Sequence, residues 1–198
     1  MALARELEKL EAAVRREKAA PDILPYKTSL VATVVGMIDA QQAAIDQPVQ
    51  SAQDKLINAL YQLDLDRVKY LLSSYLRTRL FKIQDLLFYI VNNEDQCALL
   101  SDKELEFAEK YFLLKTNHFK KRLLLKLPDG LNRLEDTGGS VSYVTAPNLD
   151  KYVFARVLED IGPFRFDGVV TQMYKDDLQL IPYEVAAELL REKKVDLV

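Results

Sequence analysis

The chain holds few of the side chains that build metal sites or nucleophilic centres. It has one histidine, His118, and one cysteine, Cys97, which lie 21 positions apart. A zinc site needs three or four ligands, so these two residues do not supply one. Cys97 also lacks the base and the orienting group that activate a nucleophile. We therefore expect neither a metal site nor a cysteine nucleophile, and no cofactor.

Two pairs of carboxylates and one glycine-rich stretch are the remaining candidates for chemistry. Asp64 and Asp66 lie two positions apart, which places them on different sides of a helix, and Asp176 and Asp177 lie in a predicted turn. Residues 138–140, Gly-Gly-Ser, lack the strand, helix and lysine of a phosphate loop and are typical of a linker. The sequence therefore favours a protein that is not an enzyme.

Composition is that of an ordinary globular protein. The 198 residues are 49% hydrophobic and 29% charged, with a net charge of −3, so the whole chain gives no case for nucleic-acid binding. Residues 127–198 are acidic, with 8 Lys/Arg against 13 Asp/Glu, and residues 1–126 are slightly basic, with 19 against 17. The single cysteine is typical of a reducing compartment. No apolar run approaches the roughly 20 residues that span a bilayer.

A long helix, from about residue 51 to 91, is the main predicted element. Its apolar residues recur at steps of three or four, which defines one helix face: Val68, Leu72, Leu76, Leu80, Ile83, Leu87 and Ile90. A second row widens that face: Leu60, Leu63, Leu71 and Tyr75. Two apolar rows form a wider surface than a single neighbouring helix would cover. The pattern indicates a helix in the middle of a bundle or one shared with a partner chain.

Further helices are predicted on either side of the long one. Residues 2–19 form a charged amphipathic helix that Pro21 stops. Residues 22–44 form a well-buried helix with Asp22 as its cap, and Gly36 favours a close helix crossing. The pattern Ser101-x-x-Glu104 is a capping box, so a helix runs from there to about residue 126. Its predicted buried residues are Leu105, Ala108, Phe112, Phe119 and Leu123.

Beyond residue 127 the hydrophobic residues no longer follow a helical spacing, and proline and glycine become frequent. Strands are predicted at 152–158, 169–174, 178–181 and 195–198, with a turn at 161–163 and a short helix from Pro182 to about residue 190. The predicted fold is mainly α. An elongated helical bundle over residues 1–127, the A domain, is followed by a linker at 128–149 and a small β-rich B domain at 150–198.

Four stretches, in this order along the chain, together resemble one family. Residues 67–83, RVKYLLSSYLRTRLFKI, resemble the core of GINS subunits, and more narrowly of their SLD-five type. Residues 17–26 (EKAAPDILPY), 99–108 (LLSDKELEFA) and 149–157 (LDKYVFARV) resemble further segments of that type. The match covers nearly the whole chain.

This resemblance implies a fold and a function. GINS is a heterotetramer of four related subunits, each with a helical A domain and a small β-rich B domain. With the Cdc-forty-five protein and the MCM ring it forms the eukaryotic replicative helicase, as a scaffold without a catalytic step. We expect a nuclear, non-catalytic subunit in the initiation and elongation of DNA replication, with three GINS siblings as partners. The alternative is a nucleic-acid-binding helical module at the fork.

The long helix is the expected subunit interface, because its two apolar rows need more partners than three short helices supply; an ordinary core within the chain is the alternative. Tyr70, Tyr75 and Arg77 are the expected anchors, since aromatic and arginine residues dominate interface energies. The expected interface residues are Val68, Tyr70, Leu72, Tyr75, Leu76, Arg77, Arg79, Leu80 and Ile83. In the B domain, whose core is thin at this size, we expect docking onto a sibling or back onto the helices through Tyr152, Phe154, Arg156 and Leu197.

A basic cluster near the end of the last long helix is the candidate for charged partners: Lys115, Lys120, Lys121 and Arg122. No groove-reading motif accompanies these residues. A solvated face or contact with acidic partners is therefore favoured over DNA, whose contact we expect to be at most weak. No membrane contact is expected.

Overall fold

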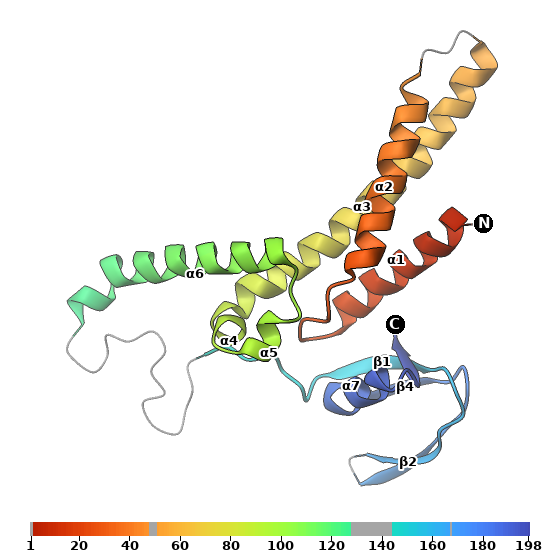
Figure 1. Ribbon diagram of the computed structural model, residues 1–198. Coiled ribbons are helices and arrows are strands. Elements are labelled where there is room, and N and C mark those ends of the chain that lie inside the picture. Colours follow the sequence, from red (N-terminus) through yellow and green to blue (C-terminus); the bar gives the residue numbers. More distant parts are fainter. Residues whose placement is uncertain (1, 48–50, 128–143, 167) are drawn as a thin grey trace.

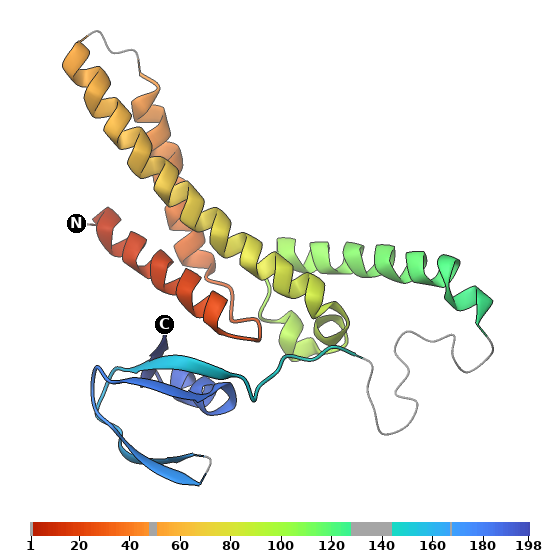
Figure 2. The same ribbon diagram turned by 180° about the vertical axis from the view of Figure 1, so that it is seen from behind.

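The computed structural model describes residues 2–47, 51–127, 144–166 and 168–198. Its helical A domain is elongated, and a small β-rich B domain lies against one end of it (Figure 1). Helices α1 (Ala2–Ala19), α2 (Thr28–Ile45) and α3 (Ala52–Asp85) pack on one another. The outer halves of α2 and α3 project from the body as a hairpin (Figure 2). The predicted fold class, a helical bundle followed by a small sheet region, is confirmed.

Helix α3 is shorter than predicted. Ser51 caps its start by accepting a hydrogen bond from the Gln53 amide. The helix ends at Asp85, where Leu86 leaves helical geometry with φ −97° and ψ 18°, and α4 (Leu87–Val91) follows at once. This change of direction buries Leu86, Leu87 and Ile90 in one apolar cluster with Ala108 of the last long helix. One continuous helix to residue 91 would not place these side chains together.

Three expectations about the second helix are wrong. Helix α2 begins at Thr28, because residues 20–27 are held irregular by other contacts: Asp22 accepts a hydrogen bond from Tyr183 and the Leu24 carbonyl accepts one from Arg79. The helix is also not well buried, since Val34 is its one buried residue. A Cβ at Gly36 would meet nothing within 4 Å, so no other helix crosses there.

The next segment begins with α5 (Glu94–Cys97), and the capping box then starts α6 (Asp102–Arg122) as predicted. The Glu104 amide donates to Ser101 Oγ, and the Ser101 amide donates to the Glu104 carboxylate. Only Glu104 and Ala108 are buried on this helix, whereas Leu123 is exposed. The second half of α6, with the short helix η1 (Leu124–Lys126), projects from the body (Figures 1 and 2).

The B domain is a three-stranded antiparallel sheet with one helix and a separate hairpin. The sheet has the order β4 (Leu178–Pro182), β1 (Tyr152–Val157), β5 (Val195–Leu197), and helix α7 is Tyr183–Arg191. Strands β2 (Gly162–Phe166) and β3 (Val169–Met173) form the hairpin. Gly162 therefore begins a strand, and the predicted turn at 161–163 is wrong. Along β1 the inward residues are Val153, Ala155 and Val157, as a period of two predicts.

The B domain packs against the end of α1 and the segment after it. Ala20 belongs to the same buried cluster as the B-domain core, and Arg16 forms an ion pair with Asp196. Most of the predicted linker, 128–143, lies outside the described residues. Among the helices of the described part, none is long and apolar enough to cross a membrane.

Candidate functional site

Arg79 is fully buried and lies where four parts of the A domain meet. Its five N–H donors are all used. They reach Glu104 of α6 at 2.8 and 3.1 Å, Glu17 of α1 at 3.2 Å, the Leu24 carbonyl at 2.5 Å and the Leu99 carbonyl at 3.1 Å. Arg79 therefore joins α3 to α1, to α6 and to the two irregular segments between the helices.

Two tyrosine rings flank the Arg79 guanidinium. Its central carbon lies 5.2 Å from the Tyr26 ring centre and 5.7 Å from that of Tyr75, within cation–π range. Burial raises the pKa of Tyr75 to about 12, even though the Arg79 charge acts in the opposite direction. Burial alone would lower the pKa of Arg79, but the hydrogen bond to Glu104 and the charge of Glu17 outweigh it and raise that pKa.

A second cation, Lys82, extends this cluster toward the B domain. Its ammonium donates to Glu17 at 3.0 Å and to the Asp22 carbonyl at 2.6 Å. Burial lowers the pKa of Lys82 against the charge of Glu17. The Asp22 carboxylate accepts the Tyr183 hydroxyl, and burial raises the pKa of Asp22 although Tyr183 and Lys82 act to lower it. These contacts join α1 and α3 to the segment after α1 and to Tyr183 of the B domain.

Sequence reasoning missed this cluster, except for Tyr75 and Arg79. Glu17 carries a signal that the sequence offers, because it follows Leu10, Ala13 and Val14 on the apolar face of α1. In the structure its side chain is 1% exposed. A charge at such a position needs a buried partner. Tyr183 carries no comparable signal, since its partner Asp22 lies 161 positions away.

The expected interface residues of α3 divide into buried and accessible groups. Leu72, Tyr75, Arg79 and Ile83 are buried within this chain, so assigning their side chains to a subunit interface is corrected: they build the chain's own core. Val68, Leu76 and Leu80 are half-buried. Only Tyr70 and Arg77 are exposed.

Helix α3 carries a second apolar row on the side opposite its buried residues. At 3.6 residues per turn, positions 56, 60, 63, 70 and 81 share one side, and Leu65, Leu72 and Ile83 lie on the other. The exposed fractions on this second side are large: 65% for Leu56, 56% for Leu60, 66% for Leu63, 69% for Tyr70 and 64% for Phe81. We call these five residues the α3 stripe. Within the described chain, no element covers them.

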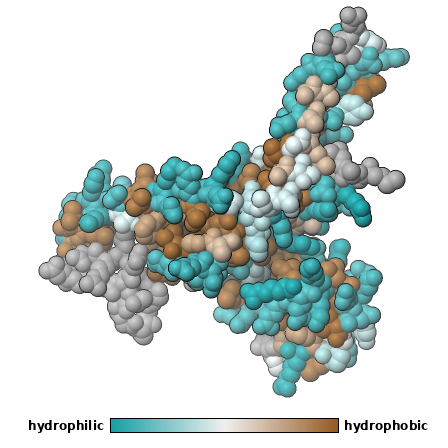
Figure 3. Space-filling model, viewed as in Figure 1, coloured by the Kyte–Doolittle hydropathy of each residue, from teal (hydrophilic) through white to brown (hydrophobic). Residues whose placement is uncertain are grey.

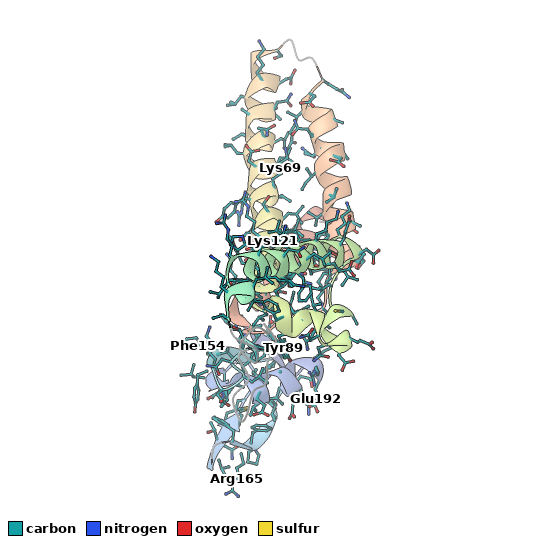
Figure 4. The ribbon with its side chains drawn as sticks, turned by 90° about the vertical axis from the view of Figure 1, so that its left-hand side faces the viewer. Lys69, Tyr89, Lys121, Phe154, Arg165 and Glu192 are labelled. Carbon is teal, nitrogen blue, oxygen red and sulfur yellow. The ribbon has the colours of Figure 1, made fainter. Side chains whose placement is uncertain are left out.

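The B-domain sheet also has an open apolar face. Phe154 on β1 pairs with Leu180 on β4, and Arg156 pairs with Leu178, so that these side chains share one face. Phe154 is 54% exposed and lies at the periphery of the domain (Figure 4). Tyr152 lies on the same strand face. Leu197, by contrast, is buried in the cluster that joins the B-domain core to Ala20, so it is not exposed for docking onto a sibling and lies instead where the B domain meets the helical part.

The basic cluster lies on the projecting half of α6. Lys120, Lys121 and Arg122 are exposed, and Lys121 lies on the outer part of the helix (Figure 4). Lys115 is half-buried, with its ammonium 5.3 Å from the Phe88 ring centre. Exposed Leu113 and Leu114 accompany the cations, and hydrophobic residues are visible between hydrophilic ones along α6 (Figure 3). This half of α6 is therefore both basic and apolar.

The described residues contain no group of three or more His, Cys, Asp or Glu able to hold a metal ion. The Cys97 thiol donates to the Ile90 carbonyl at 3.2 Å, and burial raises its pKa. A raised pKa disfavours the thiolate, which is the nucleophilic form.

Comparison with known proteins covers both parts of the chain. Residues 6–123 match the family described as GINS complex protein helical bundle domain, and residues 147–198 match the family described as DNA replication complex GINS protein SLD5 C-terminus. The chain is 32% identical to the Arabidopsis thaliana protein "DNA replication complex GINS protein SLD5", over 98% of this chain and 91% of that protein.

Relatives with the same description occur in other organisms. The Schizosaccharomyces pombe protein is 30% identical, over 92% of this chain and 86% of its own length. The mouse protein is 30% identical, over 96% of this chain and 83% of its own length. Because the helical-bundle match alone covers more than half of the residues, this chain belongs to the SLD5 family of GINS proteins of the DNA replication complex.

Proposed function

We propose that this chain is a non-catalytic structural subunit of a GINS heterotetramer, which serves as a scaffold of the eukaryotic replicative helicase. The observation that carries this proposal is the α3 stripe. A helix that is apolar on two opposite sides, with one side already buried in its own chain, needs a second neighbour. Large exposed apolar patches on soluble proteins mark sites of protein interaction.

The neighbours that fit are the three sibling subunits. In this proposal the α3 stripe, extended by Arg77, binds a helix of a sibling. The half-buried Val68, Leu76 and Leu80 lie toward the other side of α3, where Val68 and Leu76 pack against the core around Leu72. The B-domain face formed by Tyr152, Phe154 and Arg156 provides a second docking surface. The assembled complex joins the MCM ring and the Cdc-forty-five protein in the nucleus during initiation and elongation of DNA replication.

Co-expression of the full chain with its three siblings tests this proposal. We expect the four proteins to elute together, with a mass equal to one copy of each. The variants Leu63→Asp and Tyr70→Asp place a charge on the stripe and should abolish this elution while the helical content stays unchanged. The matched control is Lys55→Asp, because Lys55 is exposed on α3 but lies away from the stripe. Unchanged assembly of the two stripe variants would reject the proposed interface.

A second candidate function is favoured by one observation, the basic and projecting half of α6. In this alternative the chain is a nucleic-acid-binding helical module at the fork, and Lys115, Lys120, Lys121 and Arg122 contact phosphates. Direct contact predicts DNA affinity that falls steeply with salt, with a slope of about −0.9 for each phosphate neutralised. Charge reversal at Lys120 and Lys121 should then reduce that slope. A slope that is flat before and after the reversal counts against this alternative.

A further inference from the structure

A chain of polar contacts, buried at the α6 end and partly buried at the other, runs from α6 to the B domain. Glu104 binds Arg79, Arg79 binds Glu17, and Glu17 binds Lys82, each through an ion pair. Lys82 then donates to the backbone carbonyl of Asp22, whose carboxylate accepts the Tyr183 hydroxyl of α7. We call these six residues the polar chain.

Four of the six members have little access to water, whereas Asp22 and Lys82 are half-buried. Arg79 is 0% exposed, Glu17 1%, Glu104 6% and Tyr183 1%. A charge that loses its partner in such a site cannot be compensated by water, so the neighbouring groups must rearrange. Hydrogen bonds in buried networks also strengthen one another. A disturbance at one end therefore changes the free energy of the contacts at the other end.

The two ends of the polar chain lie on different elements of the two domains. Glu104 is in the first turn of α6, whose second half projects from the body, and Tyr183 begins α7 of the B domain. Among the described residues, the Arg16–Asp196 pair and the packing of Ala19, Ala20 and Leu24 against the B-domain core also connect the two domains. These residues come from α1 and the segment after it, and none of them belongs to α6.

We propose that the polar chain couples the placement of α6 to the placement of the B domain, so that loosening either one loosens the other. The coupling is intrinsic to this polypeptide and does not depend on which partners it binds. A protein that binds the projecting half of α6 and displaces it therefore changes how tightly the B domain is held against the A domain.

The test uses reciprocity, because a coupling free energy acts equally in both directions. Tyr183→Phe removes one hydroxyl at the B-domain end and keeps the ring. In the full chain, hydrogen exchange of the amides at 102–108 should become about two- to fivefold faster, which corresponds to about one hydrogen bond. The matched control is Tyr174→Phe, which makes the same change at an exposed tyrosine of the B domain. Exchange at 102–108 that is equal in the two variants would overturn the coupling.

The opposite direction is measured from the α6 end. Glu104→Gln removes one charge of the polar chain, and Glu106→Gln is its control, because Glu106 is exposed on the same helix and pairs with Lys110 alone. Spin labels at Glu8→Cys and Glu188→Cys, in a Cys97→Ser background, report the distance between α1 and α7. We expect a single narrow distance for the control and a broadened one for Glu104→Gln. If Glu104→Gln does not fold, the Tyr183→Phe exchange measurement decides alone.

Discussion

Arg79 holds the Glu104 carboxylate side-on, with Nε 2.8 Å from one oxygen and Nη2 3.1 Å from the other, although 25 positions separate the two residues. The same carboxylate accepts the Ser101 amide and so completes the capping box of α6. Glu104 thus serves two purposes, since it starts its own helix and fixes that helix to α3. Arginine suits this position because its planar fork binds a carboxylate through two bonds at once.

We predict that Arg79→Ala strongly destabilises the A domain. The substitution leaves Glu104 buried without a cation and leaves Glu17 with Lys82 alone, and breaking a buried pair in this way costs about 3–5 kcal/mol. The free energy of unfolding in urea measures the effect. Arg77→Ala is the control, because Arg77 is exposed two positions earlier and its loss should cost less than about 0.5 kcal/mol. Equal losses in the two variants would contradict the role of Arg79.

Alkaline pH should destabilise the fold through Tyr75. Burial raises the pKa of this phenol from 10.0 to about 12. In the unfolded chain the phenol keeps its ordinary pKa and ionises first, so stability falls as pH rises from about 10 to 12, by at most about 1.4 kcal/mol per pH unit. Tyr75→Phe should show a shallower decline in urea midpoint over that window. Tyr70→Phe, at an exposed position, should follow the unmodified chain; a decline of the same slope in all three proteins would refute this assignment.

Two B-domain substitutions should separate folding from assembly. Leu197→Ala removes a side chain that is 1% exposed and should destabilise the B domain by about 2–5 kcal/mol. Phe154→Ala removes an exposed side chain, so thermal unfolding should change little while co-elution with the siblings weakens. Thermal melts and size-exclusion chromatography read out the two effects. Normal assembly of Phe154→Ala would show that the sheet face does not dock.

Charge reversal on α6 should distinguish an acidic partner protein from no partner at all. Lys120→Glu together with Lys121→Glu reverses two exposed cations and should leave the helix folded. If an acidic sibling surface covers this half of α6, the double variant should dissociate from the complex at lower salt than the unmodified chain, because like charges then face each other. Identical salt tolerance would place these lysines in solvent. Lys175→Glu, an exposed reversal in the B domain, controls for net charge.

Local rules predicted local structure well. The capping box of α6 and the alternation along β1 depend on residues only a few positions apart, so the sequence alone contains the needed information. Asp22 shows the limit of prediction from neighbouring residues. As a possible cap preceding a proline it predicted a helix start, but its carboxylate is used by Tyr183, a partner that no local pattern reveals.

The spacing of apolar residues also could not predict which side of α3 is buried within the chain and which side is open. Apolar residues repeat on both sides of this helix, so spacing predicts that both need cover and does not say which one the chain itself supplies. Tyr75 and Arg79 were therefore assigned to a partner, and the structure buries them. The stretches that resemble the family also contain the partners of Arg79. Three of them, 17–26, 67–83 and 99–108, supply all the groups that bind this residue.

The long sequence span of the Arg79 contacts has a consequence for biosynthesis. Glu17 is made first, Arg79 next and Glu104 last, so until Glu104 emerges two of the five N–H donors of Arg79 lack their carboxylate. We therefore expect the core around α1 and α3 to close stably only after residue 104 has left the ribosome. Until then the nascent helices keep their apolar faces open, and this interval is when a chaperone or a co-translationally arriving sibling has its opportunity.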